Sequence, residues 1–116
     1  MGHELIDRAA YDALSHSMGP DFMPELVEAY LEDTPVQIAA LRRALASGEA
    51  ETFRRAAHSI KSTSKNFGAS SLAEQARELE ILGREARLEG AGSLLDALEA
   101  VFEQVRVELK ELNLES

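Results

Sequence analysis

The chain has 116 residues, of which 45% are apolar and none is cysteine, and its formal net charge is −9. This length and apolar content predict a single domain over residues 1–116 with one core, and the absence of cysteine excludes disulfides and thiolate metal sites. The 21 acidic residues disfavour nucleic-acid binding, and because no apolar run is long enough to cross a membrane, we expect no membrane association and a cytoplasmic location.

The apolar residues are spaced as in helices almost throughout, and no segment alternates in the way a strand does. A first short helix is predicted to start at Asp7, as its N-cap, and to stop at Gly19. A second helix is predicted from Asp21 to Gly48. Pro35 lies inside it and should bend it, because proline removes one helical hydrogen bond.

Three further helices follow in the sequence. The third is predicted over residues 49–66, and the fourth starts at Ser71, where Glu74 three residues on completes a capping-box pattern. Ser93 is expected to cap a fifth helix that continues to about Leu112. Four long amphipathic helices with short connections predict an all-α fold, an up-and-down four-helix bundle with the short first helix capping one end.

One segment departs from the acidic balance. Residues 52–73 carry four Lys or Arg and no Asp or Glu, which leaves 8 basic and 21 acidic residues elsewhere. Helical spacing predicts one buried face for the third helix, namely Phe53, Ala56, Ala57, Ile60, Ser64 and Phe67. His58 lies off this face, on a stripe with Arg54, Lys61 and Lys65, so we expect it to be exposed.

An exposed histidine beside lysines is most often part of an ordinary solvated face. Two features of the segment favour a functional site instead. Cations one turn from His58 on either side favour the neutral, nucleophilic imidazole. The residues at 59, 62, 63 and 64 are all Ser or Thr, which leaves the ring accessible but lowers helix propensity. The segment therefore exchanges local stability for access and charge, as functional sites tend to do.

The stretch AAHSIKSTSKNFGASSLAEQARELE, residues 56–80, resembles the signature of histidine-containing phosphotransfer (HPt) domains of two-component phosphorelays. That signature is approximately A-H-x-[IL]-K-[GS], followed by a glycine ten residues after the histidine and by an L-E pair some eleven residues further on. Residues 22–61 resemble the second and third helices of the family. The resemblance therefore covers about residues 5–112.

The resemblance implies a four-helix bundle whose histidine accepts a phosphoryl group from a receiver-domain aspartyl phosphate and passes it to the aspartate of another receiver. Carried over residue by residue, it implies that His58 is the phosphoryl carrier and that Lys61 holds the phosphoryl oxygens. Gly68 marks the end of the helix. Ser62 stands where the family usually has glycine, which narrows the space beside the imidazole.

Three other residues are assigned roles around the histidine. Glu80, in the L-E pair, either orients the second ring nitrogen of His58 or is a surface carboxylate paired with Arg77 or Arg84. Arg54 and Lys65 flank His58 on its stripe, and we expect them to attract the acidic pocket of a receiver domain.

The sequence shows no Gly-rich phosphate loop, no acidic trio for Mg²⁺ and no nucleotide-binding motif. We therefore expect a phosphoryl carrier rather than an enzyme, with neither ATP binding nor autokinase activity. No cofactor is expected, and Mg²⁺ belongs to the partner receiver. No metal site is expected, because the three histidines are far apart in the sequence. The first of them, His3, belongs to residues 1–3, which are typical of an expression remnant. The expected partners are receiver domains of response regulators or of a hybrid histidine kinase, bound by a monomer.

Two other functions are consistent with the same residues. The first is the phosphoacceptor domain of a chemotaxis-type histidine kinase, which a kinase domain loads in trans. The second is a degenerate bundle that only docks or dimerises. Incubation with ATP and kinase domains, compared with incubation with phosphorylated receivers, distinguishes a chemotaxis-type phosphoacceptor domain from a relay domain. The second predicts no acid-labile, base-stable phosphate on His58 with any donor.

Overall fold

The structure, a computed structural model, describes residues 5–114, and this part of the chain is almost entirely helical. In chain order the elements are α1 Arg8–Met18, the 3-10 helix η1 Pro20–Phe22, α2 Met23–Ser47, α3 Ala50–Asn66, α4 Ser70–Arg84 and α5 Ala91–Leu114. No strand occurs among the described residues, so the predicted all-α class is confirmed. The predicted remnant, residues 1–3, lies outside them.

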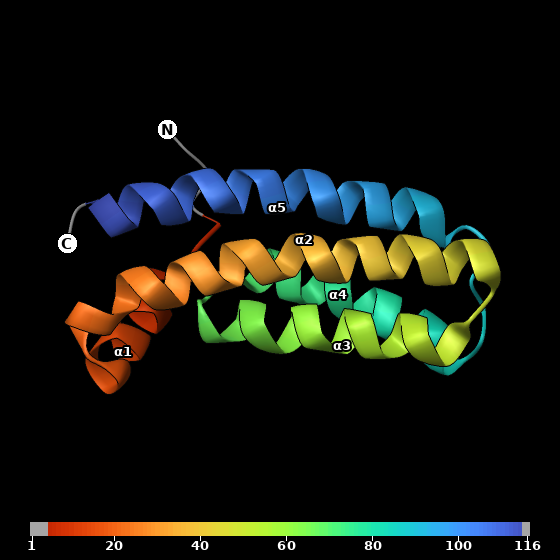
Figure 1. Cartoon of the computed structure of the whole chain (residues 1–116), viewed down its shortest axis with the longest axis horizontal. Helices are drawn as coiled ribbons and strands as arrows, with labels where there is room; N and C mark the ends of the chain where they lie inside the picture. The colour runs from red at the N-terminus through yellow and green to blue at the C-terminus, as the bar shows by residue number, and fades with distance from the viewer. Residues whose placement is uncertain (1–4, 115–116) are drawn as a thin grey trace.

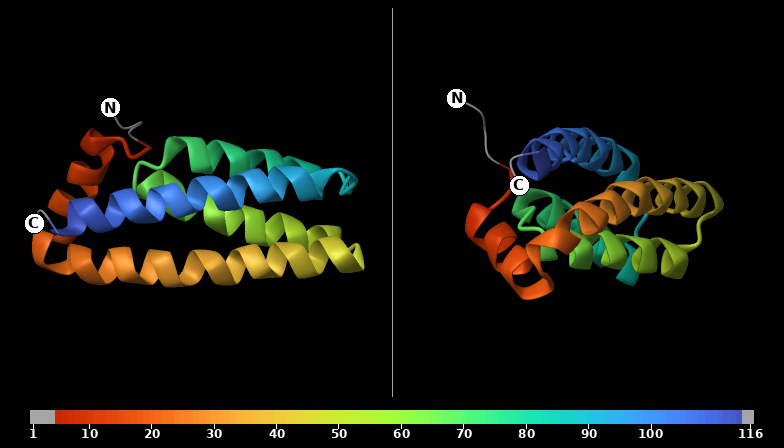
Figure 2. Two further views of the ribbon diagram at one scale, coloured as in Figure 1. Left: turned by 90° about the horizontal axis from the view of Figure 1, so that it is seen from above. Right: turned by 60° about the vertical axis from the view of Figure 1, so that its left-hand side comes forward.

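The four long helices α2 to α5 lie along the long axis of the molecule, and α1 with η1 lies at one end (Figure 1). The molecule measures 42 × 29 × 19 Å. α3 packs against both α2 and α4, and α5 packs against the same two helices. Figure 2 shows α1 beside the end of this group, close to the start of α2. Each long helix therefore buries one face between two neighbours and leaves the opposite face to solvent.

All five α-helices contribute to one apolar core. Its largest fully buried side chains include Phe53, Ile60, Leu79, Leu98 and Phe102. The six residues predicted for the buried face of the third helix are each at most 5% exposed. The core fixes the orientation of this face, so the stripe that carries His58 borders it at the surface, on the side of α3 that meets α4.

Three polar or charged side chains are buried with the core, namely Thr34, Ser64 and Glu80. The Tyr30 hydroxyl and Ser64 Oγ share a hydrogen bond of 2.7 Å, and Thr34 Oγ1 donates to the Tyr30 carbonyl at 2.8 Å. Burial raises the pKa of Tyr30 to about 12, so this side chain remains a neutral hydroxyl. Two of the three buried groups are thus paired inside the core, and the third, Glu80, faces the histidine.

The first helix begins and ends where the sequence predicts. Asp7 is its N-cap and accepts a backbone N–H through its carboxylate, and Gly19 ends it with φ +96°. Asp7 also donates its own backbone N–H to the Gly68 carbonyl at 2.8 Å. The Glu108 carboxylate on α5 accepts the backbone N–H groups of residues 5 and 6 at 2.8 and 3.0 Å. The N-terminal segment is therefore attached both to α5 and to the turn between α3 and α4.

The second helix differs from the prediction at its start. η1 takes the place of the predicted first turn, so α2 begins at Met23 rather than at Asp21. Pro20 begins η1, because its fixed φ suits the first position of a tight turn. Further on, α2 passes through Pro35 without interruption, and the bend there stays a prediction.

The two predicted serine caps, Ser71 and Ser93, are wrong, because both residues lie inside helices. α4 begins at Ser70, and its N-cap position is held by Ala69, which is fully buried and makes no side-chain cap. α5 begins at Ala91, which is also fully buried, and Ser93 Oγ donates instead to the carbonyl three residues back at 3.3 Å. Burial of a small apolar residue at each helix start thus outweighs the local capping preference.

Candidate functional site

The predicted histidine and the predicted carboxylate face each other across the α3–α4 contact. His58 lies in the middle of α3 with a side chain that is 52% exposed, whereas the Glu80 side chain on α4 is only 4% exposed. α3 and α4 form the most extensive helix–helix contact of the molecule. Small residues such as Ala57 and Ala76, both fully buried, allow the two helices to approach. The site is therefore built on the most firmly packed helix pair.

His58 Nδ1 lies 2.8 Å from Glu80 Oε2, which is hydrogen-bonding distance. An ionised carboxylate can only accept, so Nδ1 carries the proton and donates it to Glu80. In the neutral imidazole the other nitrogen, Nε2, then holds a lone pair. The contact suits the tautomer of His58 that carries its proton on Nδ1, with the Nε2 lone pair directed away from Glu80.

The same carboxylate also binds two cations. Lys61 Nζ lies 2.7 Å from Glu80 Oε1, and an Arg84 guanidinium nitrogen lies 3.7 Å from Glu80 Oε2. Burial acts to raise the pKa of Glu80, but hydrogen bonds from Lys61 and His58 outweigh it, so the pKa lies below its ordinary value. Glu80 is therefore ionised at neutral pH, which agrees with its role as acceptor for both partners.

The interpretation of Glu80 as a surface carboxylate is wrong, because the side chain is buried against α3. Of its two arginine neighbours on α4, Arg84 approaches it and Arg77 pairs instead with Glu74 at 3.6 Å. The stripe on the third helix contains only cations around His58, and Glu80 on α4 adds a negative charge in direct contact with the ring. The orienting role of Glu80 stays a prediction, now with a contact that suits it.

Ser62 and Gly68, the other two positions implied by the resemblance, lie at different distances from the ring. Ser62 is half-buried and directly follows Lys61 on α3. Gly68 follows the end of α3 with φ +78°, roughly 15 Å along the axis from His58 at the usual rise per residue. A Cβ atom at Gly68 would lie 2.8 Å from the Asp7 carbonyl oxygen. This glycine therefore serves the attachment of α1 and does not contact the ring.

The two cations predicted to steer a partner differ in their surroundings. Arg54 makes a double hydrogen bond to Glu51, at 2.9 and 2.6 Å, and the pKa of Glu51 is lowered by it. Lys65 has no ion-pair partner among residues 5–114. It lines the α3–α4 cleft, a shallow cavity of about 270 Å³ formed by Lys61, Lys65, Ser70, Ala73, Glu74 and Arg77. The free positive charge thus lies on the Lys65 side of His58.

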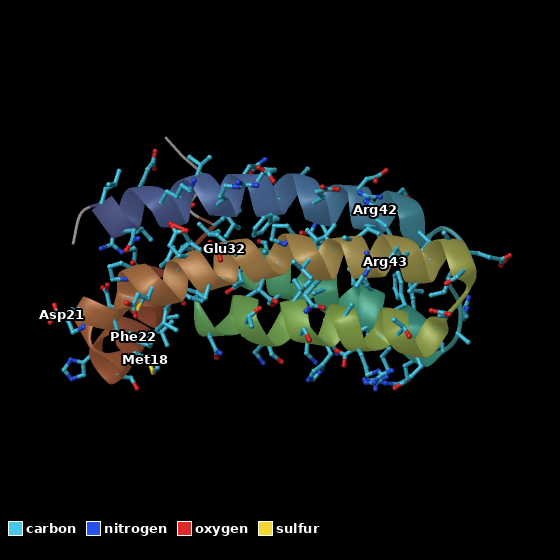
Figure 3. All side chains as sticks on the ribbon, in the orientation of Figure 1. Met18, Asp21, Phe22, Glu32, Arg42 and Arg43 are labelled. Atoms are coloured by element: carbon cyan, nitrogen blue, oxygen red, sulfur yellow. The ribbon has the colours of Figure 1, made fainter. Side chains whose placement is uncertain are left out.

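Other charged and apolar groups lie away from this site. Figure 3 shows Met18 and Phe22 together at the end of the molecule formed by α1 and η1, where they are 45% and 43% exposed. Arg42 on α2 bridges to Asp96 and Glu99 on α5, at 3.0 and 2.5 Å. The arginine on α2 thus joins α2 to α5, away from the α3–α4 cleft.

Neither a metal centre nor a membrane segment is found in the described part of the chain. Within residues 5–114, no three His, Cys, Asp or Glu side chains are grouped so that they would hold a metal ion. None of the helices there has both the length and the apolar character that crossing a membrane requires.

Comparison with known proteins identifies the family. The Hpt domain family model matches residues 25–108. The crystal structure of histidine-containing phosphotransfer protein B (HptB) from Pseudomonas aeruginosa PAO1 matches with a TM-score of 0.91 and 30% sequence identity, over 99% of each chain. A search of curated proteins finds no match. The chain belongs to the Hpt domain family.

The chain is accordingly a histidine phosphotransfer intermediary of two-component signalling. Hpt domains are phosphoryl carriers rather than enzymes, and they interact with receiver domains in phosphorelays. The family match thus agrees with the resemblance of residues 56–80 and with the helical fold.

Proposed function

We propose that His58 is the phosphoryl carrier and that the domain relays a phosphoryl group between the aspartates of two receiver domains. One observation carries this proposal: a half-exposed histidine whose Nδ1 is held at 2.8 Å by a buried carboxylate. This arrangement leaves Nε2 as a positioned nucleophile at the surface. Carriers need little more, because phosphoryl transfer depends mainly on positioning and on neutralisation of charge.

In the accepting step, the Nε2 lone pair attacks the phosphorus of the receiver's aspartyl phosphate. The bond between phosphorus and the aspartyl oxygen breaks, and its electron pair leaves with the carboxylate. The proton stays on Nδ1, so the imidazole ring gains a positive charge that faces the Glu80 carboxylate. Donation to the second receiver is the same step in reverse. We expect no cofactor in this chain, because the receiver supplies the Mg²⁺.

Lys61 and Ser62 are proposed to serve the transferred group directly. The Lys61 ammonium lies one turn from His58 and has a flexible stem, so it is able to turn from Glu80 toward the phosphoryl oxygens. Ser62 is small enough to leave room for the loop of a receiver. Gly68 is proposed to act only through the helix end and the attachment of α1.

The docking surface is proposed to centre on His58 and the α3–α4 cleft. Lys65 lines this cleft without an ion-pair partner in the described part of the chain, and its charge complements the acidic pocket that a receiver uses for metal and phosphate. Arg77 also lines the cleft, where it is loosely paired with Glu74 at 3.6 Å. Arg54 contributes less than Lys65, because Glu51 already neutralises it. We propose that the domain binds receivers of response regulators or of a hybrid histidine kinase as a monomer, without nucleic acid or membrane.

The remaining expectations concern the whole chain. We propose that residues 1–116 form one domain, with a core over residues 5–112 and α2 to α5 as an up-and-down bundle capped by α1. The ring of contacts among the four long helices supports this arrangement. We further propose a cytoplasmic location and neither ATP binding nor autokinase activity.

Incubation with a phosphorylated receiver tests the function. We expect rapid appearance of an acid-labile, base-stable phosphate on the wild-type protein and none on a His58→Gln variant. A parallel incubation with ATP and histidine kinase domains is expected to give no label. Label only in that second incubation would identify a chemotaxis-type phosphoacceptor domain, and no label with any donor would identify a docking bundle.

A further inference from the structure

Gly83, near the end of α4, lies unusually close to the backbone of α3. A Cβ atom at this position would lie 2.9 Å from Arg54 Cα, Cβ and N. Carbon atoms that are not bonded normally stay about 3.5–4.0 Å apart. Two of the three close atoms belong to the backbone, which cannot turn aside as the end of a flexible side chain would. No other residue type therefore fits at position 83 without a shift of one helix.

The glycine is unfavourable for its own helix, because glycine in a helix interior loses more backbone freedom than alanine does. Gly83 is buried where α3 and α4 are in contact. Its role is therefore to allow these two helices to pack closely. Gly92, in the first part of α5, shows the contrast. A Cβ atom there would meet only Leu45 Cδ2, at an ordinary 3.9 Å. Gly83 differs in being required by a close helix crossing.

That crossing lies beside the histidine. Arg54 is four residues before His58 on α3, and Gly83 is three residues after Glu80 on α4. The Arg54–Gly83 contact is therefore about one helical turn, roughly 5 Å, from the His58–Glu80 contact. The separation of the two helices at the crossing sets how far Glu80 has to reach. It reaches both His58 Nδ1 at 2.8 Å and Lys61 Nζ at 2.7 Å.

We propose that Gly83 is a positioning residue of the phosphoacceptor site. Its lack of a side chain lets α4 approach α3 closely enough for the buried Glu80 to hold the proton on His58 Nδ1. This inference rests on the proposed function of His58. Gly83 touches neither the ring nor the phosphoryl group, and it acts through the helix spacing and Glu80.

A methyl group at position 83 forces the crossing apart by a fraction of an ångström or more. Hydrogen bonds that are already at 2.7–2.8 Å then lengthen or lose alignment. Without its acceptor, the Nδ1 proton is free to exchange to Nε2. A ring with the proton on Nε2 has no lone pair at that atom and does not accept a phosphoryl group there, while its Nδ1 lone pair faces α4.

The test compares Gly83→Ala with Gly92→Ala in the full chain. Nitrogen-15 NMR of the His58 ring reports which nitrogen carries the proton, and phosphoramidate, a small donor with no docking surface, reports the loading rate. For Gly83→Ala we expect loading to slow about tenfold, with a shift of the ring signals toward the Nε2–H tautomer. For Gly92→Ala we expect wild-type loading and wild-type ring signals.

If Gly83→Ala unfolds, the same change is made together with Gly92→Ala, which improves helix propensity and restores stability. Wild-type tautomer and wild-type loading rate in a folded Gly83→Ala variant would overturn the inference. Failure of the proposed function is a separate result, because the wild-type protein would then accept no phosphoryl group on His58 from any donor.

Discussion

Glu80 Oε2 accepts a hydrogen bond from His58 Nδ1 at 2.8 Å, while the other oxygen of the same buried carboxylate binds Lys61 Nζ at 2.7 Å. One acidic side chain thus connects the proposed nucleophile with the cation proposed to hold the phosphoryl oxygens. Removal of either partner by mutation leaves the buried carboxylate with one hydrogen-bond donor fewer. The state of Glu80 therefore influences both stability and transfer.

The first prediction concerns the pH dependence of stability. Because the pKa of Glu80 is lower in the folded protein than in the unfolded chain, its stabilising contribution is fully present above the unfolded pKa. It is lost as the pH falls below the ordinary pKa of a glutamate, about 4.3, and through the still lower pKa of the folded state. Urea unfolding from pH 7 to pH 3 should show the wild type losing its advantage over Glu80→Gln. Glu78→Gln, an exposed change on the same helix, is the control for removal of one charge.

The second prediction concerns His58→Gln, which should abolish phosphate acceptance and leave the fold intact. The glutamine amide is able to donate to Glu80 in place of Nδ1, and half of the original side chain faces solvent. We expect the free energy of unfolding to change by about 0.5 kcal/mol or less. Urea unfolding and labelling by a phosphorylated receiver measure the two effects. A loss of several kcal/mol would contradict the placement of His58 at the surface.

The all-α class and the buried face of the third helix were predictable because they depend on helical periodicity alone. Phe53, Ile60 and Phe67 repeat at the spacing of a helix, and any fold that buries them exposes His58. The helix starts were less predictable. The buried residues Ala69 and Ala91 lie at the starts of α4 and α5, and burial in the tertiary structure is not visible in a local capping pattern.

The site was only half visible in the sequence for a similar reason. The basic stripe on α3 is local, but the approach of Glu80 depends on how α4 crosses α3, more than twenty residues later in the chain. Nor does the sequence show that Glu51 neutralises Arg54, because the same spacing also allows a pair with Arg55. A glycine inside the helical pattern at position 83 was the one local signal of the close crossing.

The third prediction concerns Lys61→Ala. We expect the transfer rate at saturating receiver to fall about tenfold or more, with a much smaller loss of receiver affinity, because the ammonium acts where phosphoryl charge develops. Stability should also fall, by about 1–3 kcal/mol, because Glu80 loses a charged partner. Single-turnover rates, titrated affinities and urea unfolding measure these effects.

Lys65→Ala is the matched control, since Lys65 lies one turn further along α3 and has no ion-pair partner among residues 5–114. It should leave stability and the saturated rate close to those of the wild type. If Lys61→Ala lowers affinity and leaves the saturated rate unchanged, Lys61 is a docking contact only.

The fourth prediction concerns steering of the receiver by charge. Arg54 precedes His58 by four residues and Lys65 follows it by seven on the same stripe of α3. Glu51 neutralises Arg54, whereas Lys65 forms no ion pair with any of the described residues and shares the α3–α4 cleft with Arg77. Receiver association should therefore be slower for Lys65→Gln than for Arg54→Gln. The charge reversal Lys65→Glu with Arg77→Glu should slow it by about tenfold at low salt, within the range of electrostatic steering.

The deficit of the double reversal should shrink as salt is added, because exposed charges are screened beyond about 8 Å at physiological ionic strength. Stopped-flow association at two salt concentrations measures it. Arg43→Glu with Lys110→Glu, on α2 and α5, changes the net charge by the same amount away from the cleft and should have a smaller effect at both concentrations. Equal association rates for the two double reversals would mean that the overall charge of the chain governs association. Equal association rates for Arg54→Gln and Lys65→Gln would contradict the asymmetry inferred from the Arg54–Glu51 pair.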